Sequence, residues 1–203
     1  VPIFVGIGYS FTKYTGIGKA KFNGLSNYQR LVHDKLFWSS LTNTLVIFVV
    51  ASVMLLVLSF ALALLLNSKL KFSDTSKALI FSPAIIAPII VGIIWVYILD
   101  PKIGLINSLL HAAGLDSFRH QWIGGTVLTP YSTAIIFFWQ QLGYLTTIFI
   151  AGLKMIPEEI IEAARVDGAS AWKRTICITI PMMRSTISTV VVLIITGIFK
   201  IFE

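Results

Sequence analysis

The feature that most constrains this chain is a long segment without any Lys, Arg, Asp or Glu, between Lys35 and Lys69. It contains the run LTNTLVIFVVASVMLLVLSFALALLLN. A helix needs about 20 mainly apolar residues to cross a bilayer, and this segment exceeds that length. Lipid offers no hydrogen-bond partner to the backbone, which a helix satisfies within its own segment. We therefore predict a membrane-spanning helix over roughly 41–66.

Further apolar runs, of which the first two are uncharged, predict more spans. They cover 78–99, 131–152 and 186–203, and the last is cut off by the end of the chain. Residues 1–12 are apolar but too short to span, so we expect the end of a truncated helix there. The composition agrees, because only 12% of the residues are charged, against about 25% in soluble domains. The expected fold class is an all-α, polytopic membrane bundle of about five spans, the first and last truncated.

The charged residues occupy the segments between these runs. Residues 13–40 contain an amphipathic stretch, NYQRLVHDKLFW, and 153–185 form the longest polar segment near the end of the chain. The formal net charge is +7, but the bases are scattered among short loops, which favours lipid headgroups and acidic partners over nucleic acid. Seven Lys and Arg fall on one side of the predicted bilayer and eight on the other, so the positive-inside rule leaves the orientation open.

The segment after the third span predicts two short helices joined at a glycine. Pro157 suits a first helical turn, and two acidic residues follow it where the helix dipole favours negative charge. Gly168 can take the left-handed conformation that ends a helix. A second helix is expected from Ala169 to about Cys177, with Pro181 at the entry to the last span. On chemistry alone, an ordinary interfacial loop in which Glu162 pairs with Arg165 is the alternative.

Three groups in this segment resemble the EAA loop of ABC-importer permeases. They are Glu162-Ala163-Ala164, then Gly168 after three residues, then Ile178-Thr179-Ile180-Pro181 after nine more. The one departure from the family pattern is Ile180 in place of Leu. Longer pieces, among them FNGLSNYQRL, IWVYILDPKIGLIN and GLKMIPEEIIEAARVDGA, are similar to the maltose-type sugar permeases, which have a type I importer fold. The likeness runs from about Phe22 to the end of the chain.

The resemblance implies an orientation and a set of partners. The loop 153–185 would be cytoplasmic, the segment 13–40 extracytoplasmic, and 41–203 part of the importer transmembrane domain in a bacterial-type cell membrane. The partners would be an ATPase dimer, a second permease subunit forming a heterodimer, and a substrate-binding protein. ATP and Mg²⁺ would bind the ATPase, with no cofactor in this chain. The residues implied in ATPase docking are Glu162, Ala163, Ala164, Asp167, Gly168 and Pro181.

Polar residues inside a span predict the substrate pathway, because they are costly unless they face a cavity or a partner. Gln140 and Gln141, with Tyr144 one turn on, suit a sugar: amides bond hydroxyl groups and rings stack on apolar sugar faces. The alternative is that these Gln side chains bond a neighbouring helix. The resemblance adds Ala84 and Pro88, which are both apolar. Lys200, in the last span, completes the pathway candidates; the alternative is that it marks the end of the helix at the membrane surface.

Proline also interrupts the second span. Pro83 and Pro88 each remove a backbone donor and can kink a helix, which could open room for substrate or serve packing alone.

Several other functions are disfavoured. The phosphate-loop-like TGIGKAKF lacks the first glycine and has Ala20 where Ser or Thr is required, so energy would come from another chain. The three histidines have no carboxylate or cysteine at metal-ligand spacing. We find no acid, base or nucleophile arrangement that predicts an enzyme. A permease for glycerol phosphate is an alternative, and an ion-gradient transporter is a further one, although its expected carboxylates are missing from the complete spans.

Overall fold

The computed structural model describes residues 2–67 and 74–201, with residues 74–77 described by their backbone alone. Residues 202–203 of the predicted last span, and most of the predicted loop at 67–77, lie outside the described residues. The chain divides into two compact units, Val1–Leu45 and Val46–Glu203.

The first unit is held by side-chain bonds around Asn27. Its elements are α1 (Pro2–Ser10), the antiparallel strands β1 (Thr12–Lys13) and β2 (Lys21–Phe22), α2 (Ser26–His33), and the start of α3 (Lys35–Asn67). The Asn27 amide donates to the carbonyl groups of Ser10, at 2.8 Å, and Thr12, at 2.9 Å. The glycine-rich run that resembles a phosphate loop lies between the two strands, where Gly16 and Gly18 have positive φ. It therefore serves as the turn of a small hairpin.

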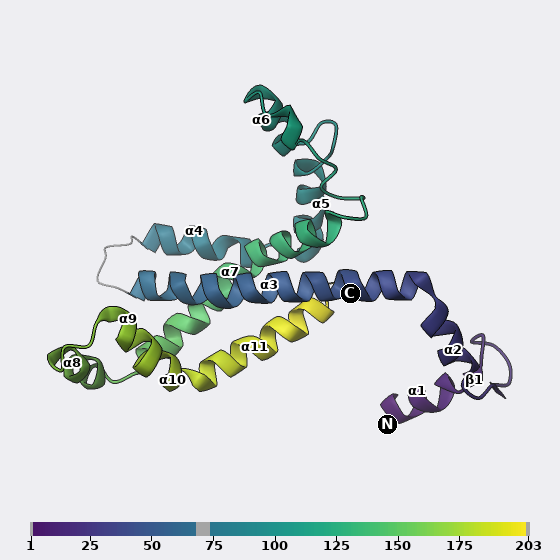
Figure 1. Ribbon diagram of the computed structural model, residues 1–203, viewed down its shortest axis with the longest axis horizontal. Helices are drawn as coiled ribbons and strands as arrows, with labels where there is room; N and C mark the ends of the chain where they lie inside the picture. The colour runs from purple at the N-terminus through teal and green to yellow at the C-terminus, as the bar shows by residue number, and fades with distance from the viewer. Residues whose placement is uncertain (1, 68–73, 202–203) are drawn as a thin grey trace. The chain divides into compact units, whose positions relative to one another are not determined.

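The second unit is helical. After the rest of α3 its elements are α4 (Asp74–Ile85), α5 (Pro88–Ile98), α6 (Leu105–Ala112), η1 (Asp116–Phe118), α7 (Thr129–Lys154), α8 (Glu158–Val166), α9 (Ala171–Arg174), η2 (Thr175–Thr179), α10 (Ile180–Met182) and α11 (Arg184–Phe199). Figure 1 shows their order along the chain. Helices α3 and α7 are each long and apolar enough to cross a membrane. They cover the spans predicted at 41–66 and 131–152.

The core of this unit lies along one stripe of α3. Its buried side chains recur every three or four residues, at Ile47, Ala51, Leu55, Ser59, Ala63 and Leu66. This spacing places them on one face of a helix. Of these, Ile47, Ala51, Leu55 and Ala63 cluster with side chains of α7 and α11, among them Leu145, Phe149, Val190 and Ile194. The Phe60 and Phe149 rings meet edge to face, with centroids 5.5 Å apart, a favoured aromatic geometry.

The span predicted over 78–99 is a pair of helices, α4 and α5, bent by 104° (Figure 1). Pro88 is the first residue of α5 and has no N–H to donate to the preceding turn. The N–H groups of Ile90 and Val91 both donate to the Ala87 carbonyl. In a continuous helix Ile90 would have bonded Ile86 instead. The break therefore leaves the Ile86 carbonyl without a helical donor.

The polar segment between α5 and α7 is organised by one buried amide. The Asn107 amide group donates to the carbonyls of Pro101 and His120, at 3.1 and 2.9 Å, and the Trp122 indole donates to its oxygen at 2.9 Å. Asn107 is 2% exposed. A buried amide is stable there because its donors and its acceptor are all used.

Candidate functional site

Helix α8 carries the EAA residues and begins after Pro157. We expected Pro157 inside the first turn, but it is the residue that precedes the helix, and Glu158 is the first helical residue. Glu158 and Glu159 therefore occupy the first turn, where the positive end of the helix dipole stabilises carboxylates.

Gly168 ends α8 in the manner predicted. Its φ is +76°, so the left-handed conformation is confirmed. The Ala169 N–H donates to the Ala164 carbonyl at 3.0 Å, and the Gly168 N–H donates to Arg165 at 3.1 Å. These two bonds form a Schellman motif, which satisfies the last carbonyls of a helix. A residue with a Cβ would pay a steric cost in this conformation.

The second short helix starts later than predicted and changes type. Ser170 caps α9 by accepting from the Lys173 N–H at 3.3 Å, so regular helix begins at Ala171. The Arg174 guanidinium donates to the Ala169 carbonyl. From Thr175 to Thr179 the backbone is a π-helix rather than an α-helix. Pro181 follows it and cannot donate to Cys177, so an α-helical bond is missing at this point.

The two alanines of the EAA motif face different ways. Ala164 is buried and Ala163 is exposed. Glu162 and Arg165 are exposed and line a cavity of about 650 Å³ beneath α8, whose other side is formed by the ends of α3 and α7. Within the residues that the structure describes, no ion pair joins Glu162 to Arg165. The pairing proposed for an ordinary loop is therefore not formed.

Large apolar side chains are exposed in this segment and just before it. Val166 at the end of α8 is 88% exposed, Met155 before it is 82% exposed, and Trp172 of α9 is 75% exposed. Asp167 and Gly168 are exposed between these helices. Val166 and Trp172, on the two helices that flank the turn, are exposed apolar side chains of the kind that contact another protein.

The structure separates the two glutamines of α7. Gln140 is 8% exposed, and its amide donates to the Ile86 carbonyl at 3.0 Å. It therefore satisfies the carbonyl that the break between α4 and α5 leaves open, as the helix-bonding alternative predicted. Gly143, on the same face of α7, lies against the backbone of Ile80 and Phe81. This face of α7 packs on α4.

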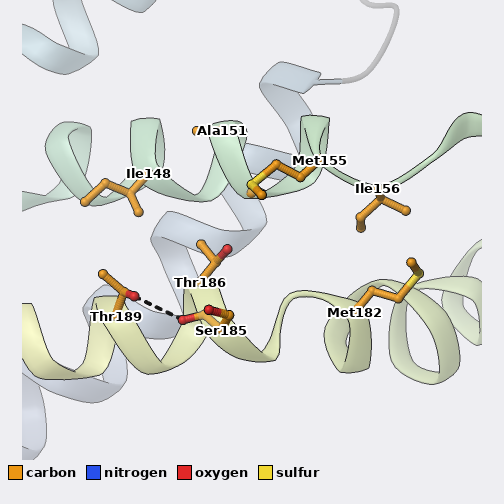
Figure 2. A pocket seen from close by; sticks show the side chains of 9 residues that line it. Ile148, Ala151, Met155, Ile156, Met182, Ser185, Thr186 and Thr189 are labelled. Carbon is orange, nitrogen blue, oxygen red and sulfur yellow. Dashed lines mark hydrogen bonds between the residues drawn. The ribbon is translucent and has the colours of Figure 1, made fainter.

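Gln141 and Tyr144 lie on another face of α7. Gln141 is half-buried and Tyr144 is 40% exposed. The same helical row continues through Ile148, Ala151 and Met155. These three residues line a cavity of about 310 Å³ between α7 and the α10–α11 turn. Figure 2 shows Met155 on the α7 side of this cavity and Met182, Ser185, Thr186 and Thr189 on the facing side.

The remaining pathway candidates lie on other elements. Ala84 is half-buried in α4, and Pro88 is exposed at the start of α5. Lys200 is exposed at the C-terminal end of α11. Gly197, one turn before Lys200, lies against the Phe137 ring, one turn before Gln141. No group of three metal-ligating side chains occurs in the part of the chain that the structure describes.

Comparison with known families identifies the chain. Residues 37–202 match the model of the family described as "Binding-protein-dependent transport system inner membrane component". The chain belongs to this family. Its spans, its broken helix pair and its EAA segment all lie within the matched residues.

Two relatives and a solved structure agree with this assignment. The "Probable ABC transporter permease protein YurN" of Bacillus subtilis (strain 168) is 33% identical over 206 residues, covering 100% of this chain and 70% of the relative. The "Probable starch degradation products transport system permease protein AmyD" of Thermoanaerobacterium thermosulfurigenes is 29% identical, covering 100% of this chain and 68% of the relative.

The solved structure is that of a bacterial ABC transporter involved in the import of the acidic polysaccharide alginate. One of its chains matches with a TM-score of 0.77 at 24% identity, over 97% of this chain and 66% of that one. The fold is therefore that of a type I ABC importer permease. This chain spans about two thirds of the length of the solved chain.

Sequence reasoning missed two contacts at these sites. The partner of Gln140 is a backbone carbonyl, which carries no sequence signal of its own, although Pro88 marks the break that frees it. The sequence does not distinguish the adjacent bases Lys173 and Arg174. In the structure, the Arg174 side chain donates a hydrogen bond to the Ala169 carbonyl in the turn.

Proposed function

We propose that this chain is the permease subunit of an ATP-driven importer that takes up a sugar or oligosaccharide delivered by a substrate-binding protein. The family name supports dependence on a binding protein. The relatives support a saccharide substrate, since one serves transport of starch degradation products and the matched transporter imports alginate.

One observation carries the coupling role: α8 ends in a fixed left-handed turn and presents exposed apolar residues beside it. In the proposed importer this segment is cytoplasmic and docks on a partner ATPase dimer, which binds ATP and Mg²⁺. Ala163 allows close approach, Gly168 permits the turn, and Glu162 and Asp167 supply charge at the rim. Pro181 joins the segment to α11. A second permease subunit completes the pathway.

The proposed pathway follows the face of α7 that carries Gln141 and Tyr144. The polar groups of Gln141 and Tyr144 remain accessible, whereas the Gln140 amide already donates to the Ile86 carbonyl. ATP must favour one membrane conformation over another by its differential binding energy, so the loop has to transmit movement to α11.

Site-directed cross-linking with transport assays tests the proposal. Cys177 is the only cysteine, so a Cys177→Ser chain accepts single cysteines at Val166 or at Val127, which is 71% exposed in the segment between α5 and α7. We expect the cysteine at 166 to cross-link to the ATPase and the one at 127 not to. Reconstituted with its partners, the importer should take up sugar only with ATP and the binding protein.

Two results would contradict the proposal. One is labelling of position 166 from outside the cell by a membrane-impermeant reagent. The other is uptake driven by a proton or sodium gradient without ATP, which would favour a secondary transporter.

A further inference from the structure

The turn between α8 and α9 receives little support from packing beneath α8. Of the nine residues of α8, Ala164 is the one that is buried. The cavity of about 650 Å³ lies between this helix and the ends of α3 and α7. Because close packing is what normally fixes one helix against another, the orientation of α8 must depend on the turn that follows it.

The peptide groups of Ala169 join the two helices. Its N–H donates backwards to Ala164, within α8. Its carbonyl accepts forwards from the Arg174 guanidinium, at the end of α9. The Arg174 N–H also donates to the Ser170 carbonyl at 2.9 Å. Arg174 is therefore tied to the turn by its backbone and by its side chain.

Its neighbour Lys173 gives the internal comparison. The two residues are adjacent, and both are basic and close the same helix. The Lys173 side chain makes no hydrogen bond or ion pair with any described residue and is exposed. Arg174 is half-buried. A guanidinium is a planar donor that is always charged, and it loses less freedom per bond than a lysine ammonium would.

We propose that Arg174 is a positioning residue, which fixes the angle between α8 and α9 so that a push on α8 moves α11. The inference rests on the proposed function, because it assumes that α8 receives the movement. Beyond α9 the chain continues through the π-helix and α10 into α11. There Thr186 and Met183 lie against Gly152 of α7 with no room for a Cβ on the glycine, so movement of α11 is passed to α7.

Without the guanidinium, the Ala169 carbonyl loses its forward partner and the angle between the helices is no longer fixed. The ATPase would still bind α8, because the exposed surface around Val166 is unchanged. Part of its movement would then be absorbed in the turn. The expected result is ATP hydrolysis that continues while transport falls.

The test uses the whole reconstituted importer and measures sugar uptake and ATP hydrolysis in the same vesicles. For Arg174→Met, which keeps the apolar stem, we expect the ATP consumed per sugar transported to rise about tenfold, since hydrogen bonds to charged groups are among the stronger ones in proteins. Arg174→Lys should lie between this variant and the wild type. Lys173→Met, which removes a neighbouring charge, should keep the wild-type ratio.

The remaining outcomes contradict either the role of Arg174 or the proposed function. A wild-type ratio in Arg174→Met overturns the inference, as does an equal rise in Lys173→Met. If Arg174→Met does not assemble, Arg174→Gln replaces it. Failure of both to assemble makes Arg174 a folding residue and also overturns the inference. A wild-type importer that takes up no sugar with ATP would instead refute the proposed function.

Discussion

Replacing Gly143 by Ala tests the contact between α4 and α7 directly. A Cβ at this position would lie 2.2 Å from the Ile80 carbonyl oxygen and 2.7 Å from the Phe81 Cα. Both atoms belong to the backbone, so no side-chain rotation relieves the clash. Ordinary contact begins at 3.4 Å, and α4 and α7 must therefore separate by about 1.2 Å at this point.

The separation has a second effect one turn away. Gln140 lies on the same face as Gly143, and its 3.0 Å bond to Ile86 would stretch beyond hydrogen-bond range. Overpacking of this kind costs about 1–3 kcal/mol, and loss of the bond about 1 kcal/mol more. We expect the melting temperature to fall by about 4–16 °C, because a chain of this size shifts by about 2–4 °C per kcal/mol.

Thermal unfolding in detergent, followed by circular dichroism, measures this effect. Gly92→Ala is the matched control, because a Cβ built on Gly92 in α5 has no atom within 4 Å apart from its chain neighbours and the backbone of its own helix. Alanine favours a helix over glycine by about 1 kcal/mol, so this control should melt at or above the wild-type temperature. Equal melting temperatures for the two variants would refute the close approach of α4 to α7.

Three further predictions follow from single contacts. Gln140→Leu should lower stability by about 1–3 kcal/mol in the same unfolding assay, because Ile86 loses its donor, and leave the transport KM unchanged; a raised KM at normal stability would return Gln140 to the pathway. Gly168→Pro should abolish uptake while membrane insertion, measured by fractionation, survives; unchanged ATP-driven uptake would remove the docking role. The hydrogen bond with His111 is the main cause that lowers the pKa of Asp116 from its usual 3.8. The ionised carboxylate therefore stabilises the fold above pH about 4, and this contribution is lost as the pH falls through the lowered pKa. Asp116→Asn should remove this part of the fall in melting temperature at acid pH. An unchanged fall in the variant would show that Asp116 does not contribute to it.

Much of the local structure could be predicted from the sequence. Long uncharged runs indicated α3 and α7, because length and hydropathy alone decide whether a helix can cross a bilayer. The turn at Gly168 was predictable because its cause is local: one residue without a Cβ follows an amphipathic helix. The EAA segment was recognised by its resemblance to ABC-importer permeases, and the family match at 37–202 agrees with that family.

The sharp bend between α4 and α5 could be predicted only in part. Pro83 and Pro88 indicated a weak point, but Pro83 is accommodated inside α4 while the chain breaks just before Pro88. Which proline ends a helix depends on what satisfies the freed carbonyl. Here Gln140 does so from another helix, and it lies 54 residues after Ile86 in the sequence.

The features that could be predicted are therefore local: which segments are helical and apolar enough for lipid, and where the chain must turn. Packing between helices sets which side of each helix contacts protein. Helix α3 is apolar on most of its surface, so hydropathy does not separate the buried stripe of Ala51, Leu55 and Ser59 from the rest of the helix. The same holds for Gln140 and Gln141, which are chemically identical and face different surroundings. Hydropathy is a property of each residue alone, whereas burial depends on the neighbours that bends and turns bring to it.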